Sequence, residues 1–221
     1  MRPSFASWTT HVYNPWLSRA RLLRGARAFT DASDDFSLLG NRAEVIQLNK
    51  FANLQGERAR VFAGPWCRAL TDEVDRETRA AFWELIRVTP AIDWFLLFDG
   101  AFETSIKVPA DWDDGYANCW VGVKLAGPTR AAEQLDALRA MPARHRFAVA
   151  APFVEDLGDL NLLGLDWFMA QLSDERQIEP DAVTALKLQC MAYGVRFWLE
   201  EVDALGGKQG TRFSFREEPA P

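Results

Sequence analysis

The sequence predicts an α/β fold: a partial or distorted (β/α) barrel with mostly parallel strands. Its apolar residues switch repeatedly between the period of a strand and the period of a helix, which is typical of alternating strands and helices. The runs at residues 94–98 and 147–150 are apolar on both faces, as parallel strands covered by helices are. No glycine-rich nucleotide-binding motif follows any run, which favours a barrel over an open, doubly wound sheet.

Seven strands are expected from these runs. They cover residues 44–48, 60–63, 93–98, 119–125, 146–150, 165–170 and 195–199. From the second strand onward, the starts lie roughly 20 to 35 residues apart, which is the length that a strand–helix–strand crossover requires.

Three connecting helices are expected between these strands. The first covers residues 72–88 and has acidic side chains in its first turn, where the helix dipole favours them. The second follows Pro128 and Thr129. The third begins at Pro180, a favoured first helical position, and stops before Gly194, a favoured position for a C-terminal cap.

Composition indicates one globular domain. Hydrophobic residues make up 48% of the 221 residues and charged residues 25%, as in proteins with a packed core. We divide this single domain, residues 1–221, into an N-terminal segment (1–42), strand–helix repeats (43–205) and a tail (206–221).

The net charge, the apolar runs and the cysteines of the sequence argue against a nucleic-acid-binding, a membrane-spanning and a secreted protein. The net charge of −6 argues against a dedicated nucleic-acid binder, because phosphate affinity comes mostly from clustered Lys and Arg. No apolar run approaches the ~18 residues of a membrane span, and the first residues lack the apolar core of a secretory signal. Three widely spaced cysteines, Cys67, Cys119 and Cys190, suggest reduced thiols and a cytoplasmic location.

A set of short segments carries a family resemblance. Residues 8–15 read Trp-Thr-Thr-His-Val-Tyr-Asn-Pro, and residues 164–167 read Gly-Leu-Asp-Trp. Residues 60–63 (Arg-Val-Phe-Ala), 118–123 (Asn-Cys-Trp-Val-Gly-Val) and 188–197 complete a set that spans nearly the whole chain. In order and spacing, the set resembles the phage-associated, radical-SAM-like three-Cys-motif family. The resemblance implies a barrel of the radical-SAM type and a phage-associated protein.

The chain departs from that family where the cofactor would bind. In the family, three cysteines follow the Asn-Pro and would hold an iron–sulfur cluster that reduces S-adenosylmethionine. The aligned positions here are Arg19, Ala26 and Phe29, which cannot replace thiolate ligands. Polar positions after other strands are changed as well, at Arg68, at Asp99 and in residues 124–126, 150–152, 171–173 and 200–203.

The residues that match the family build strands and turns, whereas the replaced ones lie at the C-terminal ends of strands, where a barrel carries its chemistry. The resemblance therefore implies a pseudoenzyme without a cofactor that acts as a binding or regulatory partner of another protein. The partner-binding candidates are Arg19, Arg21, Arg24, Arg27, Trp16 and Trp112. Alternatively, the arginines are solvated on a short amphipathic helix over residues 18–29, and the loop tryptophans cover the barrel mouth.

A second hypothesis is a repurposed enzyme or small-ligand binder that uses the barrel mouth. Its candidate residues are Asn14, Trp66, Cys67, Arg68, Asp99, Lys124 and Glu200. Cys67 follows a strand beside an arginine that favours its thiolate, but a nucleophile also needs a base. Of the two histidines, His11 leads toward the mouth, whereas His145 precedes a strand and is expected at the opposite end. A nucleic-acid role through the arginine segment is a third hypothesis.

No metal site is expected. Acidic residues cluster at 31–35, at 113–114 and at 155–159, but none of these clusters has the spacing of a calcium-binding loop. Cys119 and Cys190 are expected to be packing residues.

Overall fold

The computed structural model describes residues 9–13, 15, 37–38, 41–63, 75–99, 108–125, 127–153, 155–172 and 180–200. The elements, in chain order, are β1 (His11–Val12), β2 (Ser37–Leu38), α2 (Arg42–Gln55), β3 (Ala59–Phe62), α3 (Arg76–Arg87), β4 (Ile92–Asp99), β5 (Cys119–Lys124), α4 (Pro128–Ala140), β6 (His145–Phe153), β7 (Trp167–Leu172), α5 (Pro180–Ala192) and β8 (Arg196–Glu200).

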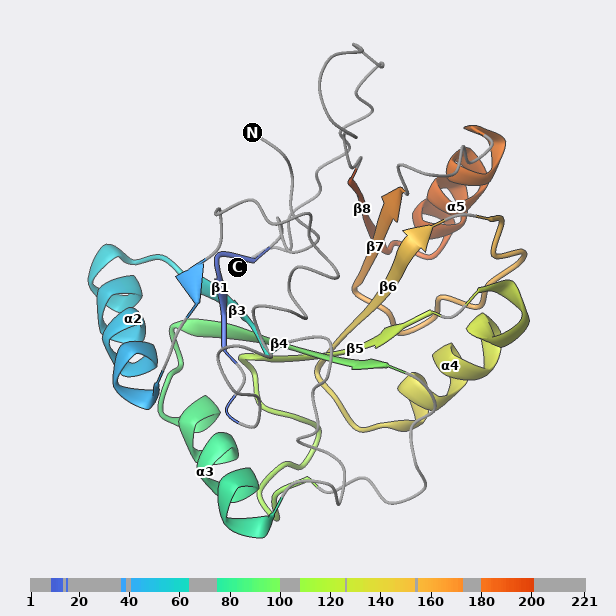
Figure 1. Cartoon of the computed structure of the whole chain (residues 1–221). Coiled ribbons are helices and arrows are strands. Elements are labelled where there is room, and N and C mark those ends of the chain that lie inside the picture. Colours follow the sequence, from blue (N-terminus) through green and yellow to red (C-terminus); the bar gives the residue numbers. More distant parts are fainter. Residues whose placement is uncertain are drawn as a thin grey trace.

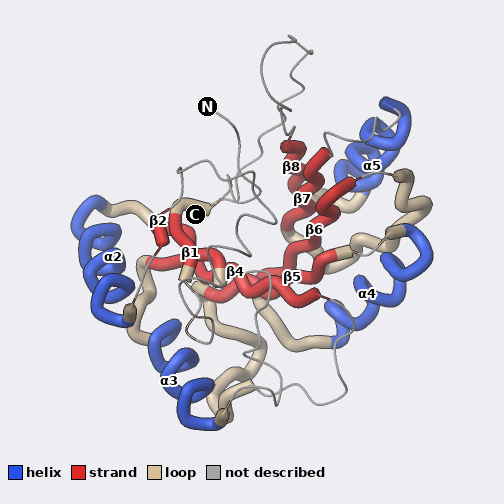
Figure 2. Tube along the Cα trace, in the orientation of Figure 1, coloured by secondary structure: helices blue, strands red, loops and turns tan. Residues whose placement is uncertain are grey.

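These strands form one sheet, in the order β2-β1-β3-β4-β5-β6-β7-β8, and all of its neighbouring pairs are parallel. From β3 onward, strands adjacent in the sheet are also consecutive in the sequence. The sheet curls into a half-barrel, and helices α2 to α5 lie around its outer face (Figures 1 and 2). The predicted partial, mostly parallel barrel is confirmed at this level.

One predicted strand is wrong, because residues 44–48 lie in helix α2. The Asn41 side chain caps the helix by accepting hydrogen bonds from the backbone N–H groups of Ala43 and Glu44, at 2.9 and 3.1 Å. Gly56 ends the helix with a φ of 67°, a conformation that glycine adopts without strain. Val45 and Ala52, seven residues apart, are both buried on one face of the helix.

The other predicted strands correspond to β3 through β8, with bounds that differ by at most three residues. The three predicted helices correspond to α3, α4 and α5. Asp75 caps α3 by accepting a hydrogen bond from the Thr78 N–H at 2.8 Å, so the helix begins at residue 76, four residues later than expected. Gly194 follows α5 with a φ of 69°, as the sequence predicts for its C-terminal end.

Successive residues of a strand point to opposite faces of the sheet, and the hydrophobic residues of the two faces form two separate clusters. On β4, Trp94, Leu96 and Phe98 belong to the outer cluster, which also includes the buried residues of the helices. Phe95 and Leu97 belong to the second, which we call the inner cluster. Its members are Val12, Phe62, Phe95, Leu97, Trp120, Phe147, Val149, Ala151, Trp167, Met169 and Trp198. Cys119 and Cys190 are buried, as expected for packing residues.

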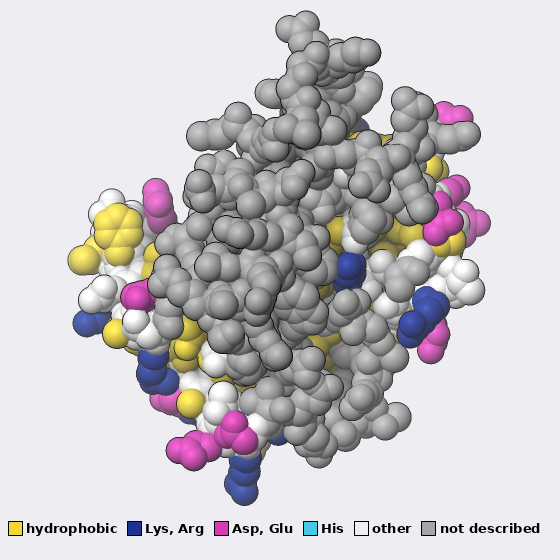
Figure 3. Space-filling view, in the orientation of Figure 1, with side chains coloured by type: hydrophobic (Ala, Val, Ile, Leu, Met, Phe, Trp, Pro, Cys, Tyr) yellow, Lys and Arg dark blue, Asp and Glu magenta, His cyan; other side chains and the backbone are white. Residues whose placement is uncertain are grey.

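On the face drawn in Figure 3, charged side chains of both signs lie over the helices at the rim. None of the described helices is both long enough and apolar enough to cross a membrane.

Candidate functional site

Aromatic rings fill the inner face of the half-barrel. Phe95 stacks on Trp120, with ring centroids 5.4 Å apart and planes at 19°. Trp167 meets Trp120 edge to face at 6.3 Å and Trp198 at 6.0 Å. Barrel interiors are commonly filled by branched aliphatic side chains, so this interior is unusually rich in flat rings.

Gly122 shows how tightly this face is packed. A Cβ atom added at Gly122 would lie 2.4 Å from Cζ of Phe147, far inside van der Waals contact. The Phe147 ring therefore occupies the space that a side chain on β5 would otherwise take. The same ring contacts Phe95 edge to face at 5.4 Å.

The C-terminal ends of the strands carry three of the predicted mouth residues. The register pairs Asp99 of β4 with Lys124 of β5, so these two positions are direct neighbours in the sheet. Glu200 pairs with Gln171 of β7, and strands β6 and β7 separate it from Lys124. The backbone carbonyl of Lys124 accepts a hydrogen bond from Nε2 of Gln134 at 3.0 Å, which fixes the end of β5 against α4.

The other predicted residues lie outside the part of the chain that the structure describes, with one exception. Outside it are Asn14, Trp66, Cys67, Arg68, Trp16, Arg19, Arg21, Arg24 and Arg27. The exception is Trp112, and its prediction as an exposed partner-binding residue is wrong, because only 2% of it is exposed. Its Nε1 donates to the Pro142 carbonyl at 2.7 Å, and its ring contacts Trp83 at 5.1 Å.

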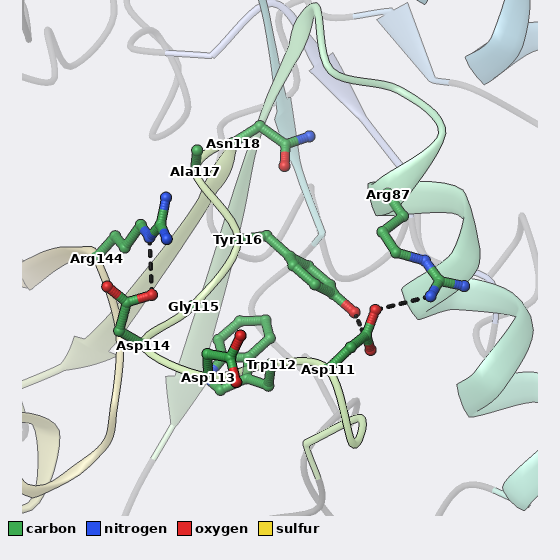
Figure 4. A pocket seen from close by; sticks show the side chains of 10 residues that line it. All are labelled: Arg87, Asp111, Trp112, Asp113, Asp114, Gly115, Tyr116, Ala117, Asn118 and Arg144. Carbon is green, nitrogen blue, oxygen red and sulfur yellow. Dashed lines mark hydrogen bonds and ion pairs between the residues drawn. The ribbon is translucent and has the colours of Figure 1, made fainter.

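Trp112 forms the floor of a pocket of about 250 Å³ at the N-terminal ends of the strands (Figure 4). On one side, Asp111 accepts hydrogen bonds from Tyr116 Oη at 2.9 Å and from Arg87 Nη1 at 2.8 Å. On the other side, Arg144 Nε donates to Asp114 at 2.9 Å. Sequence reasoning missed this pocket, because its charged residues come from three separate segments and form no motif.

The hydrogen bonds in this pocket shift two pKa values. Donation by the Tyr116 hydroxyl and then by the Arg87 guanidinium lowers the pKa of Asp111, because both stabilise the carboxylate. Burial of the phenol, followed by its hydrogen bond to Asp111, raises the pKa of Tyr116. The lowered pKa favours the carboxylate form of Asp111, which accepts the hydrogen bond, and the raised pKa favours the neutral phenol of Tyr116, which donates it.

Asn118, which also lines this pocket, is a structural residue. Its Nδ2 donates to the carbonyls of Ile86, Thr89 and Ile92 at 3.0 to 3.2 Å, and so satisfies the end of α3 and the start of β4. The pocket therefore lies where α3 is hydrogen-bonded to the start of β4, and four of its charged residues form two ion pairs, Arg87 with Asp111 and Arg144 with Asp114.

Comparison with known proteins gives one match. The model of a family described as a protein of unknown function, DUF5131, matches residues 4–212. The chain belongs to the DUF5131 family. Neither a curated protein nor a solved structure matches the chain.

The two histidines of this DUF5131 chain lie in different surroundings. His145 begins β6, at the N-terminal end as expected, and its ring stacks on Trp120 at 4.5 Å and 18°. His11 lies in β1, where its Nδ1 is 2.8 Å from Oγ1 of Thr10, and burial lowers its pKa. Within the described ranges, no three His, Cys, Asp or Glu side chains are close enough together to hold a metal ion.

Proposed function

We propose that this DUF5131 chain is a catalytically inactive, radical-SAM-like barrel that acts as a binding or regulatory partner of another protein. The observation that carries the proposal is the inner cluster, which places one buried aromatic ring on each of the strands β4 to β8. Barrel enzymes place their reacting groups at the C-terminal end of the strands, in a concave space with convergent polar side chains. The inner cluster places rings on β4 to β8 before the last residues of these strands, with the aliphatic Leu97, Val149 and Met169 beside them.

The depth of this packing supports the proposal. Trp198 is the last member of the inner cluster on β8, two residues before the strand ends, and only 4% of it is exposed. The Trp198 ring contacts Trp167 on β7, which contacts Trp120 on β5, so the aromatic contacts extend from β5 to the last strand, β8.

The sequence supports the same proposal independently. The positions that align with three cluster cysteines hold Arg19, Ala26 and Phe29, so the chain lacks the thiolates that a cluster needs. A chain that keeps the residues of the strands and loses those thiolates keeps a scaffold on which partner surfaces can form.

Metal and sulfide analysis tests the inactive state. The full chain is purified anaerobically, incubated with ferrous iron and sulfide, desalted, and assayed for bound iron and acid-labile sulfide. We expect neither at a stoichiometric level and no charge-transfer absorption of an iron–sulfur cluster. Stoichiometric iron with sulfide would overturn the proposal.

A second candidate function, a small-ligand binder at the mouth, has one observation in its favour. The register places a carboxylate residue, Asp99, beside an amine residue, Lys124, at the C-terminal ends of two central strands. The test compares the small molecules retained by the native chain with those retained by Asp99→Asn and Lys124→Met. A molecule released by both variants, but not by the exposed control Gln47→Ala, would favour this function over the first.

A further inference from the structure

Helix α5 and the loop before β7 expose four large hydrophobic side chains, which we call the α5 patch. They are Leu163, Leu188, Met191 and Tyr193, with exposed fractions of 67, 58, 63 and 46%. The opposite side of the helix, with Ala182, Leu186 and Cys190, is buried in the outer cluster. A helix that is apolar on two opposite faces indicates a second contact surface.

The loop and the helix form one continuous surface. Nε2 of Gln189 donates to the Gly158 carbonyl at 2.9 Å, and the Leu160 N–H donates to Oε1 of Gln189 at 2.8 Å. Further along the loop, the Asp166 carbonyl accepts a hydrogen bond from the Arg196 N–H at 3.2 Å. The loop thus contacts α5 at Gln189 and β8 at Arg196, and Leu163 lies between these two contacts in the sequence.

The loop beside the α5 patch has only acidic charged residues of its own, although Arg139 of α4 donates a hydrogen bond to the Asn161 carbonyl in this loop at 2.5 Å. The loop from residue 155 to residue 166 contains Glu155, Asp156, Asp159 and Asp166 and no Lys or Arg. Figure 3 shows acidic side chains next to hydrophobic ones on the side of the molecule where α5 lies. Within α5 the one charged residue after Asp181 is Lys187. The field along this border attracts cations and repels phosphate groups.

We propose that the α5 patch docks a basic amphipathic helix of a partner protein. Leucine and methionine side chains adapt to the apolar face of such a helix, and the acidic loop pairs with the Lys or Arg residues that flank it. The acidic border disfavours nucleic acid and anionic membranes as occupants. This inference rests on the proposed function, since it assigns the surface on which a binding protein would hold its partner.

Two designed peptides test the inference directly. Both are 18-residue helices of Leu and Ala on one face, with Lys on the other face in one peptide and Glu in the second. Binding to the full chain is measured by fluorescence anisotropy. We expect the Lys peptide to bind at least about tenfold more tightly than the Glu peptide, and to bind less tightly as salt is added.

Matched variants locate the surface. Leu188→Asp with Met191→Asp should weaken the Lys peptide at least about tenfold, whereas Phe51→Asp with Leu54→Asp, an equally exposed apolar pair on α2, should leave its affinity unchanged. Asp159→Lys keeps the apolar residues and should weaken binding most at low salt. Thermal melting by circular dichroism verifies that each variant is folded.

Three results obtained without a natural partner would overturn the inference. The first is equal binding of the Lys and Glu peptides, and the second is unchanged binding by the α5 variant. The third is a dimer of the chain alone, measured by sedimentation, that the α5 variant dissociates, since a second copy would then cover the patch. A purified partner that still binds the α5 variant with full affinity would overturn this inference and leave the proposed function intact. Stoichiometric iron and sulfide bound to the chain would instead overturn the proposed function alone.

Discussion

At the residue scale, one glycine controls how the inner face packs. Gly122 lies on β5 against the Phe147 ring, and the nearest ring atoms would be 2.4 to 2.5 Å from an added Cβ. Phe147 is fully buried and contacts Phe95, so its ring has little room to move. The absence of a side chain at Gly122 is therefore a requirement of the packing.

We expect Gly122→Ala to lower the free energy of unfolding by about 1–3 kcal/mol, because the methyl group overpacks the inner cluster. Combining it with Phe147→Leu should reduce that cost by at least about 1 kcal/mol, since a smaller side chain makes room. Urea denaturation of the four variants of this double-mutant cycle measures both effects. Strict additivity of the two substitutions would contradict the packing described for this face.

The carboxylate of Asp111 gives a second residue-scale prediction, on pH. Its pKa lies below the ordinary value of 3.8 because Tyr116 and Arg87 donate hydrogen bonds to it. A carboxyl group whose pKa is lower in the folded chain stabilises the fold above the unfolded pKa, and this contribution is lost as the pH falls through the folded pKa. Asp111→Asn should therefore melt below the native chain at pH 7, and the difference should shrink toward pH 3.

Circular dichroism melts of both proteins across this range measure the effect. Glu133→Gln, on the exposed side of α4, is the control for replacing a surface carboxylate with an amide. A difference between Asp111→Asn and the native chain that is as large at pH 3 as at pH 7 would contradict the assignment.

At the element scale, α2 shows where local sequence patterns mislead. Residues 44–48 read Glu-Val-Ile-Gln-Leu, which has the β-branched, alternating character of a strand. The helix forms because Asn41 caps it, Gly56 ends it and Val45 packs toward the sheet. The caps lie three residues before and eight residues after the misleading run, so a prediction from the run alone could not include them.

We expect Asn41→Ala to destabilise the chain by about 1 kcal/mol, which is the usual cost of losing a helix N-cap. Two backbone N–H groups lose their acceptor, and Glu44 loses the hydrogen bond that Nδ2 of Asn41 donates to it at 2.8 Å. Chemical denaturation measures the cost, with the exposed Gln47→Ala as control. Equal stability of the two variants would show that the cap contributes nothing.

At the scale of the whole molecule, the sequence predicts the barrel type because parallel strands leave a strong pattern. Runs that are apolar on both faces, separated by helical segments of crossover length, specify a parallel sheet covered by helices. The strand register, which makes Asp99 and Lys124 neighbours, was not predicted from the sequence. Contacts between segments far apart in the sequence leave no periodic pattern of apolar residues. The burial of Trp112, whose Nε1 donates a hydrogen bond to the Pro142 carbonyl, was therefore not predictable.

The candidate sites divide in the same way. The inner cluster could be anticipated from the tryptophans expected in strands, of which Trp120, Trp167 and Trp198 enter it. The pocket at the N-terminal ends needed knowledge of where α3 ends relative to the loop before β5, because Arg87 and Asp111 meet only in the folded chain. Likewise, the α5 patch becomes visible only when one face of α5 is known to be buried.

The most direct test of a non-catalytic binding protein is native mass spectrometry of the full chain, purified gently and anaerobically from the cells that produce it. Our account predicts a stoichiometric complex with a second polypeptide, and no mass that corresponds to a cluster or a small molecule. A retained small molecule or an iron–sulfur cluster, without any second polypeptide, would contradict it and direct attention to Asp99 and Lys124 at the barrel mouth.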